Sequence, residues 1–536
     1  MTRRLLAFAV AIAWLAGCGG RASGPSYAIP PMTNVAPARV SPDHNVNELP
    51  QEPVVRSVNG VAKVTLIADI NPATGLPGFL YGGLHGISPT IRVKPGDTID
   101  IELENQLQAI KGDADDMNLH FHGLGASPKA PGDDVLTMLA KPGQTLHYVV
   151  HVPKNQEPGL YWYHPHVHRQ TNYQVGEGGM SGAIVVDGLQ RHLPGLEKMK
   201  ERVIVVRSTG IGQTIKPEED VDEDGMSMGG GDAMGGSAAM GSMDTMHPFI
   251  TNKHPCSSKD GLTTSLNGAV HPVITIAPHE KQFFRVVNAT GHKTLNLAID
   301  GGKFEVVAID GFALDTYPGT PATKTVSTIV IPPAARAEFV VTGPASGHAK
   351  FRTLCYDTGP DGDADPPLVL ASLKAPAHGQ DGGSFDQRPL TVGAPLPQNV
   401  YTEPLPPVAA KRLVVFSEGA KHFYINGKAF SMRSPPMFVV HVGTVEEWTV
   451  RNDTQEIHDF HIHQTHFVVE SVNGKKLTHP FWADSFVVPH RASDGTPGTA
   501  KLLMDFRDPI IRGEFLFHCH ILDHEDSGMM AKIQAI

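Results

Sequence analysis

The sequence predicts an all-β chain of three consecutive Greek-key barrel or sandwich domains. Glycine and proline are abundant, with 55 and 44 residues, while the apolar segments are short, which favours many strands and turns over long helices. A strand, turn and strand pattern occurs three times along the chain. The length of 536 residues also exceeds what one hydrophobic core usually occupies.

The repeated pattern runs from a proline to an asparagine sixteen positions later. Apolar and polar residues alternate on both sides of a central turn, which is typical of half-buried strands. The three copies extend from Pro89 to Asn105, from Pro272 to Asn288 and from Pro436 to Asn452. Regularly spaced short strands of this kind indicate sandwiches or barrels with Greek-key connections.

The repeat and the composition together suggest the domain boundaries. The predicted segments are a signal peptide at 1–18, a tether at 19–51, domains at 52–205, 206–375 and 405–536, a Met-rich loop at 225–246 and a Pro-rich linker at 376–404. The formal net charge of −11 argues against nucleic acid as the main partner, and no basic face is visible.

The N-terminus carries an export signal. Arg3 and Arg4 precede an apolar run from Leu5 to Ala16, which is too short to cross a bilayer as a helix. The run ends in Leu-Ala-Gly-Cys18, which resembles the lipobox of bacterial lipoproteins, whose cysteine is lipidated. We therefore expect an exported protein, periplasmic or anchored through Cys18 to the outer or cell membrane, with an ordinary cleaved signal as the alternative.

Two further cysteines are candidates for a disulfide. Cys256 and Cys355 remain after Cys18 is assigned to the signal and Cys519 is found between two histidines. In an oxidising compartment the pair would close a loop of about 100 residues. Two buried free thiols are the alternative.

Four short blocks contain the candidate metal ligands, and each block contains a His-x-His pair. The blocks are His120-Phe121-His122-Gly123, Trp162-Tyr163-His164-Pro165-His166, His458-Asp459-Phe460-His461-Ile462-His463, and His518-Cys519-His520 followed by His524 and Met529. Residues two apart on a strand point to the same face, so four pairs supply eight imidazoles, more than one ion can use. A closed zinc site explains too little, because the chain offers only one plausible thiolate ligand.

The last block adds the ligands of a second kind of site. Two histidines, one cysteine and a weak axial methionine describe a blue-copper electron-transfer centre, and His458, Cys519, His524 and Met529 supply that set. Cys519 projects from the face of its strand opposite to His518 and His520. Neighbouring residues can therefore serve two metal centres.

The motifs HFHG, WYHPH, HDFHIH and HCHILDHEDSGMM match, in order, the four copper motifs of multicopper oxidases, and the last is most similar to bacterial laccases, bilirubin oxidases and copper-efflux oxidases. The resemblance covers essentially all of the mature chain. It implies three cupredoxin-like domains and four copper ions, with a trinuclear cluster between the first and third domains. It assigns His458, Cys519, His524 and Met529 to the type 1 copper, His120 and His461 to the type 2 copper, and His122, His164, His166, His463, His518 and His520 to the type 3 pair.

The resemblance also implies the reaction. The protein would take single electrons from phenolic or aromatic donors or from Cu(I), and would pass four electrons to O2 to make water. The alternative is an extracytoplasmic copper-binding or copper-tolerance protein without significant organic oxidase activity. Copper nitrite reduction is disfavoured, because that chemistry needs no cluster of eight histidines.

Oxygen reduction consumes protons, so carboxylates near the cluster have a plausible task. The candidates are Glu525, Asp133 and Asp134. Glu525 follows His524 as in the bacterial laccases that the chain resembles, which use such a glutamate in proton delivery. An acidic residue also often follows the first motif in the family, although Asp133 or Asp134 could merely cap a turn.

The Met-rich loop is a candidate for substrate capture. Its methionines are Met226, Met228, Met234, Met240, Met243 and Met246. Thioethers suit Cu(I), and the segment resembles in composition the insert of copper-efflux oxidases, although that insert lies elsewhere in their chains. A flexible linker with incidental methionines is the alternative. His168 and His466 lie beside ligand blocks but are not expected to bind metal.

Overall fold

A computed structural model describes residues 48–107, 115–210, 256, 262–376, 388–396, 398–419 and 422–536. The predicted signal peptide with Cys18, most of the predicted tether and the Met-rich loop lie outside the described residues. No helix within the described ranges is both long enough and apolar enough to cross a membrane.

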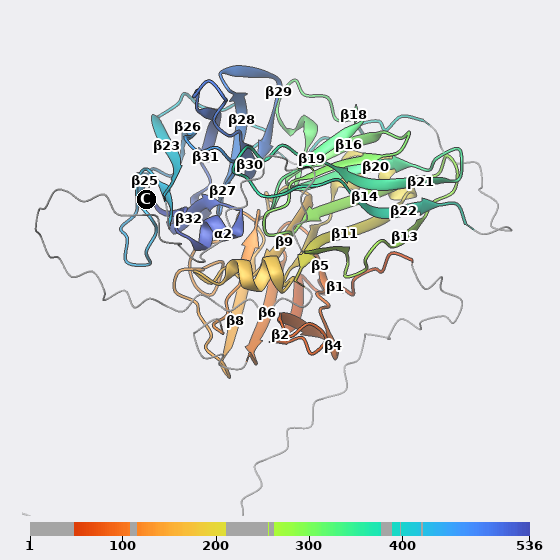
Figure 1. Cartoon of the computed structure of the whole chain (residues 1–536), viewed down its shortest axis with the longest axis horizontal. Helices are drawn as coiled ribbons and strands as arrows, with labels where there is room; N and C mark the ends of the chain where they lie inside the picture. The colour runs from red at the N-terminus through yellow and green to blue at the C-terminus, as the bar shows by residue number, and fades with distance from the viewer. Residues whose placement is uncertain are drawn as a thin grey trace, which may run out of the picture. The chain divides into compact units, whose positions relative to one another are not determined.

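The described chain is built from six β-sheets that pair into three sandwiches, which follow one another along the colour ramp of Figure 1. The first sandwich combines the sheets β1-β5-β10-β9-β7 and β4-β3-β2-β6-β8. Its strands are β1 (Val54–Arg56), β2 (Val61–Ile70), β3 (Pro77–Tyr81), β4 (Leu84–His85), β5 (Thr90–Val93), β6 (Thr98–Asn105), β7 (His120–His122), β8 (Thr145–His151), β9 (Gly159–His164) and β10 (Gly182–Val186).

The second sandwich combines the sheet β12-β11-β14-β20-β16-β17, in which β18 also pairs with β16, and the sheet β13-β22-β21-β15-β19. Its strands are β11 (Lys200–Thr209), β12 (Thr263–Leu266), β13 (Val273–Thr275), β14 (Lys281–Asn288), β15 (Leu295–Ile299), β16 (Phe304–Ile309), β17 (Phe312–Ala313), β18 (Lys324–Val326), β19 (Thr328–Ile331), β20 (Arg336–Thr342), β21 (His348–Leu354) and β22 (Leu368–Lys374). The predicted boundary between residues 205 and 206 falls within β11, which pairs with β14 from Lys200 onward.

The third sandwich combines the sheets β24-β23-β26-β31-β28-β29 and β25-β33-β32-β27-β30. Its strands are β23 (Ala410–Glu418), β24 (Phe423–Ile425), β25 (Phe438–Val440), β26 (Thr444–Asn452), β27 (His458–Ile462), β28 (His466–Val472), β29 (Lys475–Ala483), β30 (Ser485–Val488), β31 (Gly498–Phe506), β32 (Gly513–Cys519) and β33 (Met530–Ala535).

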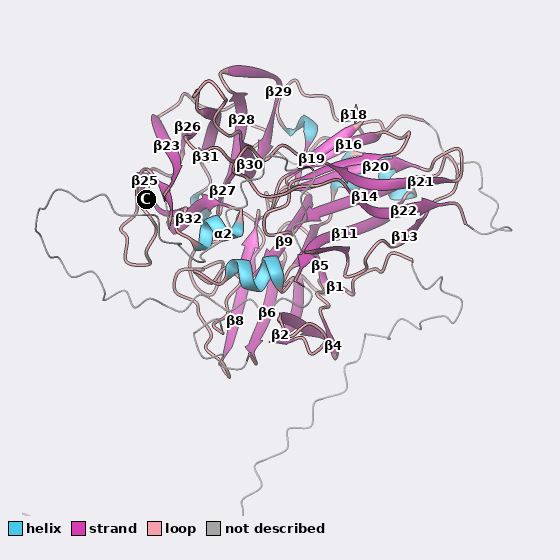
Figure 2. Ribbon diagram, viewed as in Figure 1, coloured by secondary structure: helices cyan, strands magenta, loops and turns pink. Residues whose placement is uncertain are grey.

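Helices are short in the described chain, and Figure 2 shows them in cyan among the strands. They are η1 (Asn172–Glu177), α1 (Leu189–His192), η2 (Pro194–Lys198), η4 (Leu314–Thr316), η5 (Pro509–Ile511) and α2 (Leu522–Asp526). Each sandwich encloses its own apolar core between its two sheets. The predicted all-β fold class is therefore confirmed.

The threefold repeat corresponds to one structural unit in each sandwich. The two strands of a copy lie in opposite sheets, β5 and β6 in the first, β13 and β14 in the second, and β25 and β26 in the third. The asparagine that ends each copy is buried, and its side-chain amide donates to two backbone carbonyls, as in Asn288 at 2.8 Å to both Lys293 and Ile331. An amide provides these two donors together with an acceptor for the following turn, which explains the residue type.

The predicted disulfide is present. Cys256 and Cys355 are bonded with their Cα atoms 5.3 Å apart. Cys355 follows β21 and leads into a loop whose Thr358 carbonyl accepts a hydrogen bond of 2.9 Å from the backbone N–H of Ile457. The bridge therefore fixes a loop of the second sandwich that contacts the third.

Candidate metal centre

The eight histidines of the His-x-His pairs meet between the first and third sandwiches. β7 pairs with β9 so that His120 faces His164, and β27 pairs with β32 so that His461 faces His518. Rings from the two strand pairs stack on each other, His120 on His463 at 3.7 Å between centroids and His122 on His461 at 3.9 Å. All eight side chains are buried. The second sandwich contributes none of them.

Nitrogen atoms of these rings approach closely enough to share metal ions. Three sets have ligand atoms within 4.8 Å of one another, namely His120, His122 and His164; His120, His461 and His463; and His166, His463 and His518. In the last set, Nε2 of His518 lies 3.3 Å from Nε2 of His166 and 3.2 Å from Nε2 of His463. Nitrogens bound to one tetrahedral ion at about 2.0 Å would be about 3.3 Å apart. The remaining histidine, His520, lies 5.2 Å from His122 and 5.4 Å from His164 between ring centroids.

The hydrogen bonding of the rings supports metal binding. Several buried ring nitrogens have no hydrogen-bond partner within the described part of the chain, namely Nε2 of His120, His164 and His461, Nδ1 of His122 and His463, and both nitrogens of His520. A buried polar atom without a partner is costly unless it binds an ion. The opposite nitrogens of three rings are held, His120 by the Asp133 carboxylate at 3.0 Å, His164 by the Pro165 carbonyl at 2.8 Å and His461 by the Asp484 carbonyl at 2.8 Å. This pattern is characteristic of metal-bound histidine.

The protonation of the rings agrees with this assignment. Burial, followed by the charge of neighbouring histidines, lowers the pKa of His164, His461 and His463 well below the usual value. Burial also lowers the pKa of His166 to about 4. These four rings are therefore neutral near pH 7, as metal coordination requires. Neutral imidazoles suit copper, so the donor set fits this metal.

A second group of predicted ligands lies on the other side of β32. Nδ1 of His458 is 3.0 Å from Nδ1 of His524, and Sγ of Cys519 is 3.6 Å and 3.8 Å from these two atoms. Met529 is fully buried, and its backbone N–H donates to the His524 carbonyl while its carbonyl accepts from the N–H of Cys519. The four residues predicted to form a blue-copper centre are therefore neighbours.

The surroundings of Cys519 determine its protonation. Burial raises the pKa of the thiol well above its usual value, whereas hydrogen bonds from the backbone of Ile521 and Asp459 lower it. The N–H of Asp459 lies 3.3 Å from Sγ. A metal bound at this site would displace the thiol proton, and these N–H groups would stabilise the resulting thiolate.

Glu525 lies against the histidine cluster. Its Oε1 accepts a hydrogen bond of 3.0 Å from the Thr171 hydroxyl and is 3.4 Å from Nε2 of His166. Its Oε2 is 3.1 Å from Nδ1 of His518. The side chain is fully buried on α2. A carboxyl group is thus present beside two of the predicted ligands.

The structure separates Asp133 from Asp134. Asp133 contacts Nδ1 of His120 and accepts a hydrogen bond of 2.6 Å from the Gln464 amide. Asp134 instead accepts from the backbone N–H groups of Leu136 and Thr137, at 3.1 Å and 2.9 Å. Asp133 is therefore the aspartate in contact with the cluster, and Asp134 caps the turn that follows it.

Two residues of the site lie outside the four histidine motifs of the sequence. Asp484 lies between β29 and β30, and its carboxylate is 3.0 Å from Nε2 of His122. Arg336 on β20 of the second sandwich donates two hydrogen bonds to this carboxylate. His466 was not expected to bind metal, and its ring contacts the Gly123 carbonyl at 3.0 Å and the Tyr401 hydroxyl at 3.2 Å.

The edge of the Cys519 site is aromatic and acidic. The ring of His524 stacks on Phe423 at 4.0 Å, and Nε2 of His524 lies 3.6 Å from Oε2 of Glu456. Burial, together with the nearby carboxylates of Glu418, Asp363 and Asp523, raises the pKa of Glu456 well above its usual value. Several acidic side chains therefore gather at this edge of the site, and they disfavour the ionised form of Glu456.

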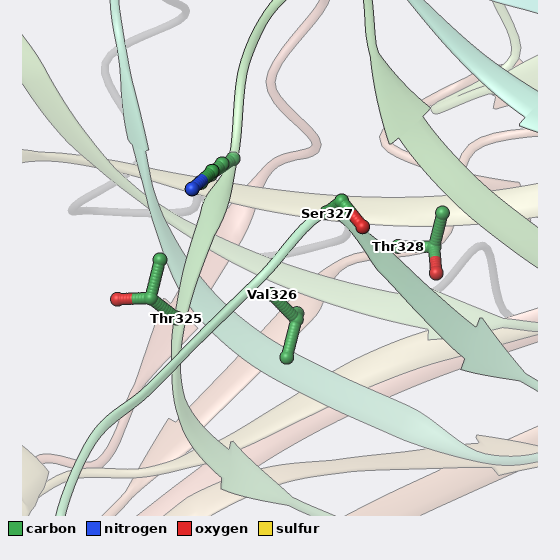
Figure 3. Close-up of a pocket in the computed structure, with 5 residues that line it drawn as sticks. Thr325, Val326, Ser327 and Thr328 are labelled. Carbon is green, nitrogen blue, oxygen red and sulfur yellow. The ribbon is translucent and has the colours of Figure 1, made fainter.

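A surface hollow also occurs on the second sandwich, lined by Lys303 and by residues 325–328, and Figure 3 shows its side chains. It contains none of the predicted ligands. Its hydroxyl and ammonium groups offer no redox chemistry, so it is not a candidate active site.

Comparison with known proteins agrees with the fold and the site. Three family models, each described as multicopper oxidase, match residues 84–191, 232–370 and 402–535. The multicopper oxidase mco of Staphylococcus epidermidis is 26% identical over 459 residues, covering 84% of this chain and 82% of that protein. A laccase of Bacillus subtilis is 24% identical over 402 residues, covering 71% of each chain. A solved multicopper oxidase from Campylobacter jejuni, described as a metallo-oxidase, has a TM-score of 0.65 at 22% identity, covering 92% of this chain and 98% of that one.

The fold and the two ligand groups define a copper enzyme built of cupredoxin-like domains. The chain belongs to the multicopper oxidase family. It is a laccase-like, copper-dependent oxidoreductase with O2 as electron acceptor.

Proposed function

We propose that the protein holds four copper ions and couples the one-electron oxidation of a small donor to the four-electron reduction of O2 to water. The observation that carries this proposal is the meeting of four His-x-His pairs beside a separate site with a single thiolate ligand. Copper bound at such sites supplies one-electron transfer and the binding of O2. The family comparisons favour this oxidase over a protein that only sequesters copper.

The ligands divide by site. His458, Cys519, His524 and Met529 would hold the type 1 ion, and His120 and His461 the type 2 ion. The type 3 pair would take one ion on His122, His164 and His520 and the other on His166, His463 and His518. The convergence of Nε2 atoms at His518 supports the second of these triplets.

Two carboxyl groups have positions suited to proton delivery. Glu525 lies next to His166 and His518, and its hydrogen bond to the Thr171 hydroxyl gives it a partner for proton exchange. Asp133 holds Nδ1 of His120 and so stabilises the tautomer whose Nε2 can bind metal. Asp134 is not assigned a part in the reaction.

Two features support Cu(I) as a donor alongside phenols and aromatic amines. The carboxylates of Glu418, Asp363 and Asp523, which lie near Glu456, attract cations to the edge of His524. The Cys256–Cys355 bridge ties the chain ten positions after Met246 to the loop that contacts Ile457, next to His458. A thioether-rich segment attached there could deliver Cu(I) to the type 1 site.

The protein would work outside the cytoplasm. The predicted export signal and the Cys256–Cys355 disulfide both favour an oxidising compartment. Cys18 is proposed as the lipid-modified residue that anchors the mature chain to the membrane. Mass spectrometry of the mature N-terminus tests this, and an unmodified residue downstream of Cys18 would exclude the anchor.

The deciding experiment combines copper analysis with oxygen uptake. The full mature chain loaded with copper should hold four ions, show a blue absorption and consume O2 with Cu(I) and with a phenol. Deletion of residues 225–246 should slow oxygen uptake with Cu(I) and leave uptake with the phenol unchanged. A chain that binds copper but consumes no O2 with any donor would favour the sequestration alternative.

A further inference from the structure

Arg336 joins the three sandwiches at one point. Its side chain is fully buried on β20 of the second sandwich. Nε donates to the Leu160 carbonyl of the first sandwich at 3.1 Å, and Nη2 donates to the Asp310 carbonyl of the second at 3.1 Å. Nη1 and Nη2 donate to the two carboxylate oxygens of Asp484 of the third sandwich, both at 2.6 Å. Such a two-pronged pair fixes the orientation of the carboxylate as well as its position.

Asp484 contacts two rings of the cluster and thereby fixes their orientation. Its Oδ1 lies 3.0 Å from Nε2 of His122, and its backbone carbonyl accepts from Nδ1 of His461 at 2.8 Å. His122 therefore carries its proton on Nε2 and His461 carries its proton on Nδ1. The nitrogens left over, Nδ1 of His122 and Nε2 of His461, are two of the buried atoms that lack a partner within the described ranges. The contacts of Asp484 thus decide which atom each ring presents to metal.

Charge explains why an arginine is needed. Asp484 and Asp310 are both fully buried, and the backbone N–H of Asp484 donates to the Asp310 carboxylate at 3.2 Å. Two buried carboxylates require a compensating cation, because an unpaired buried charge is strongly destabilising. Arg336 is that cation, and it also lies 3.4 Å from Oδ1 of Asp310.

The glycine of the HFHG motif gives independent support. A Cβ at Gly123 would lie 2.3 Å from Nη2 of Arg336 and 2.7 Å from Oδ2 of Asp484. Gly123 also has a positive φ of 81°, which favours glycine. The Arg336–Asp484 pair therefore packs directly against the residue that follows His122.

We infer that Arg336 is a positioning residue for the histidine cluster, acting through Asp484 to set the tautomer and orientation of His122 and His461. The inference rests on the copper-ligand assignment made above. The second sandwich, which contains none of the predicted ligands, would thereby determine the geometry at two predicted ligands contributed by the first and third.

Arg285 provides a matched control. It is also a fully buried arginine of the second sandwich, on β14, and it pairs with Glu338 and, at 2.7 Å, with Glu201. No contact between its side chain and Asp484 or a predicted ligand is found in the described structure. The Arg285→Met and Arg336→Met variants therefore remove similar buried charges, but only the second removes the contact with Asp484.

The test compares copper-loaded full-length variants by copper content, blue absorption and the electron paramagnetic resonance signal of the type 2 copper. Arg336→Met and the near-isosteric Asp484→Asn should each hold cluster copper about 10- to 100-fold more weakly and alter the type 2 signal, while the blue absorption stays. Compared with Arg336→Met, Arg336→Lys should restore copper binding and the type 2 signal only in part, because an ammonium cannot make the two-pronged contact. Arg285→Met should leave both signals as in the wild type.

An unchanged type 2 signal with full copper content in Arg336→Met would overturn the inference. If Arg336→Met does not fold, Asp484→Asn and Gly123→Ala decide, since both should alter the type 2 signal, and normal signals in both would refute the inference. Failure of the proposed function is distinguishable, because the wild type itself would then lack the blue absorption and the full copper content.

Discussion

Cys519 and His518 are adjacent on β32, yet their side chains belong to different sites. Sγ of Cys519 lies 3.6 Å from Nδ1 of His458, whereas Nε2 of His518 lies 3.3 Å from Nε2 of His166. Alternation along the strand sends successive side chains to opposite faces. A single peptide bond therefore connects the residues that serve the proposed electron-accepting and oxygen-reducing sites.

The first prediction concerns this connection. Cys519→Ser should abolish the blue absorption and turnover, because a hydroxyl does not replace the thiolate ligand. The copper of the histidine cluster should stay bound. The Cys256→Ser/Cys355→Ser double variant is the control, since it removes two sulfur atoms distant in sequence from the ligands and should keep the blue absorption. Turnover retained by Cys519→Ser would contradict the type 1 assignment.

The second prediction separates proton delivery from electron uptake. Glu525→Gln should slow reoxidation of the reduced enzyme by O2 by about 100-fold or more, because the amide cannot transfer a proton. Reduction of the blue copper by a donor should keep its rate. Asp526→Asn is the matched control on the same helix, because it makes the same carboxylate-to-amide change and its amide oxygen can still accept from one of the two N–H groups, those of Thr171 and Asn172, that the carboxylate binds. Stopped-flow absorption measures both steps, and equal reoxidation rates in Glu525→Gln and wild type would reject the role.

The third prediction compares the two adjacent aspartates. Asp133→Asn should weaken copper retention or activity by about 10- to 100-fold, because Asp133 holds the ring of His120. Asp134→Asn should change activity little, since an amide oxygen can still accept from Leu136 and Thr137. Copper content after dialysis and oxygen uptake measure the difference. Equal effects of the two substitutions would show that the contact with His120 is not decisive.

The fourth prediction concerns pH and stability. Burial raises the pKa of Glu157 to about 7, although its hydrogen bond from the Asn399 amide opposes the shift. The folded-state pKa of Glu157 lies above the unfolded value of 4.5, so its neutral carboxyl contributes to the free energy of unfolding. This contribution is fully present below pH 4.5 and is lost as pH rises through about 7. The loss amounts to about 3 kcal/mol.

Glu157→Gln should therefore be more resistant to denaturant than the wild type at pH 8 and show no such gain at pH 5. The midpoint of chemical unfolding at the two pH values measures this difference. Glu403→Gln, at an exposed position, should behave as the wild type. An equal response of wild type and Glu157→Gln to pH would show that Glu157 does not ionise in this range.

The convergence of the candidate ligands could be predicted because their spacing is encoded locally. Each His-x-His pair needs only the two-residue period of a strand to bring its rings to one face, and Cys519 needs the same period to face the other way. Cys256 and Cys355 could be named only as candidates for a disulfide, because the other two cysteines were assigned elsewhere while two free thiols remained the alternative. The sequence repeat marks three similar units. Its final asparagine has the same structural role in each unit, since the side-chain amide donates to backbone carbonyls.

The contacts that orient the ligands could not be predicted in this way. Arg336 and Asp484 are 148 positions apart and belong to different sandwiches, so no local spacing connects them. The choice between Asp133 and Asp134 depends on the turn after β7, where one carboxylate faces His120 and the next faces backbone N–H groups. The predicted division between residues 205 and 206 falls inside β11, because strand pairing with β14 continues through it and no local composition marks that pairing.

The division of the cluster histidines between the two ends of the chain has a consequence for biosynthesis. His120, His122, His164 and His166 are translated some 300 residues before His461 and the ligands that follow it. A chain that ends before His461 therefore contains only four of the eight histidines and cannot form the proposed oxygen-reducing centre. The cluster can therefore form only after the third sandwich, which carries the other four histidines, has been synthesised and folded.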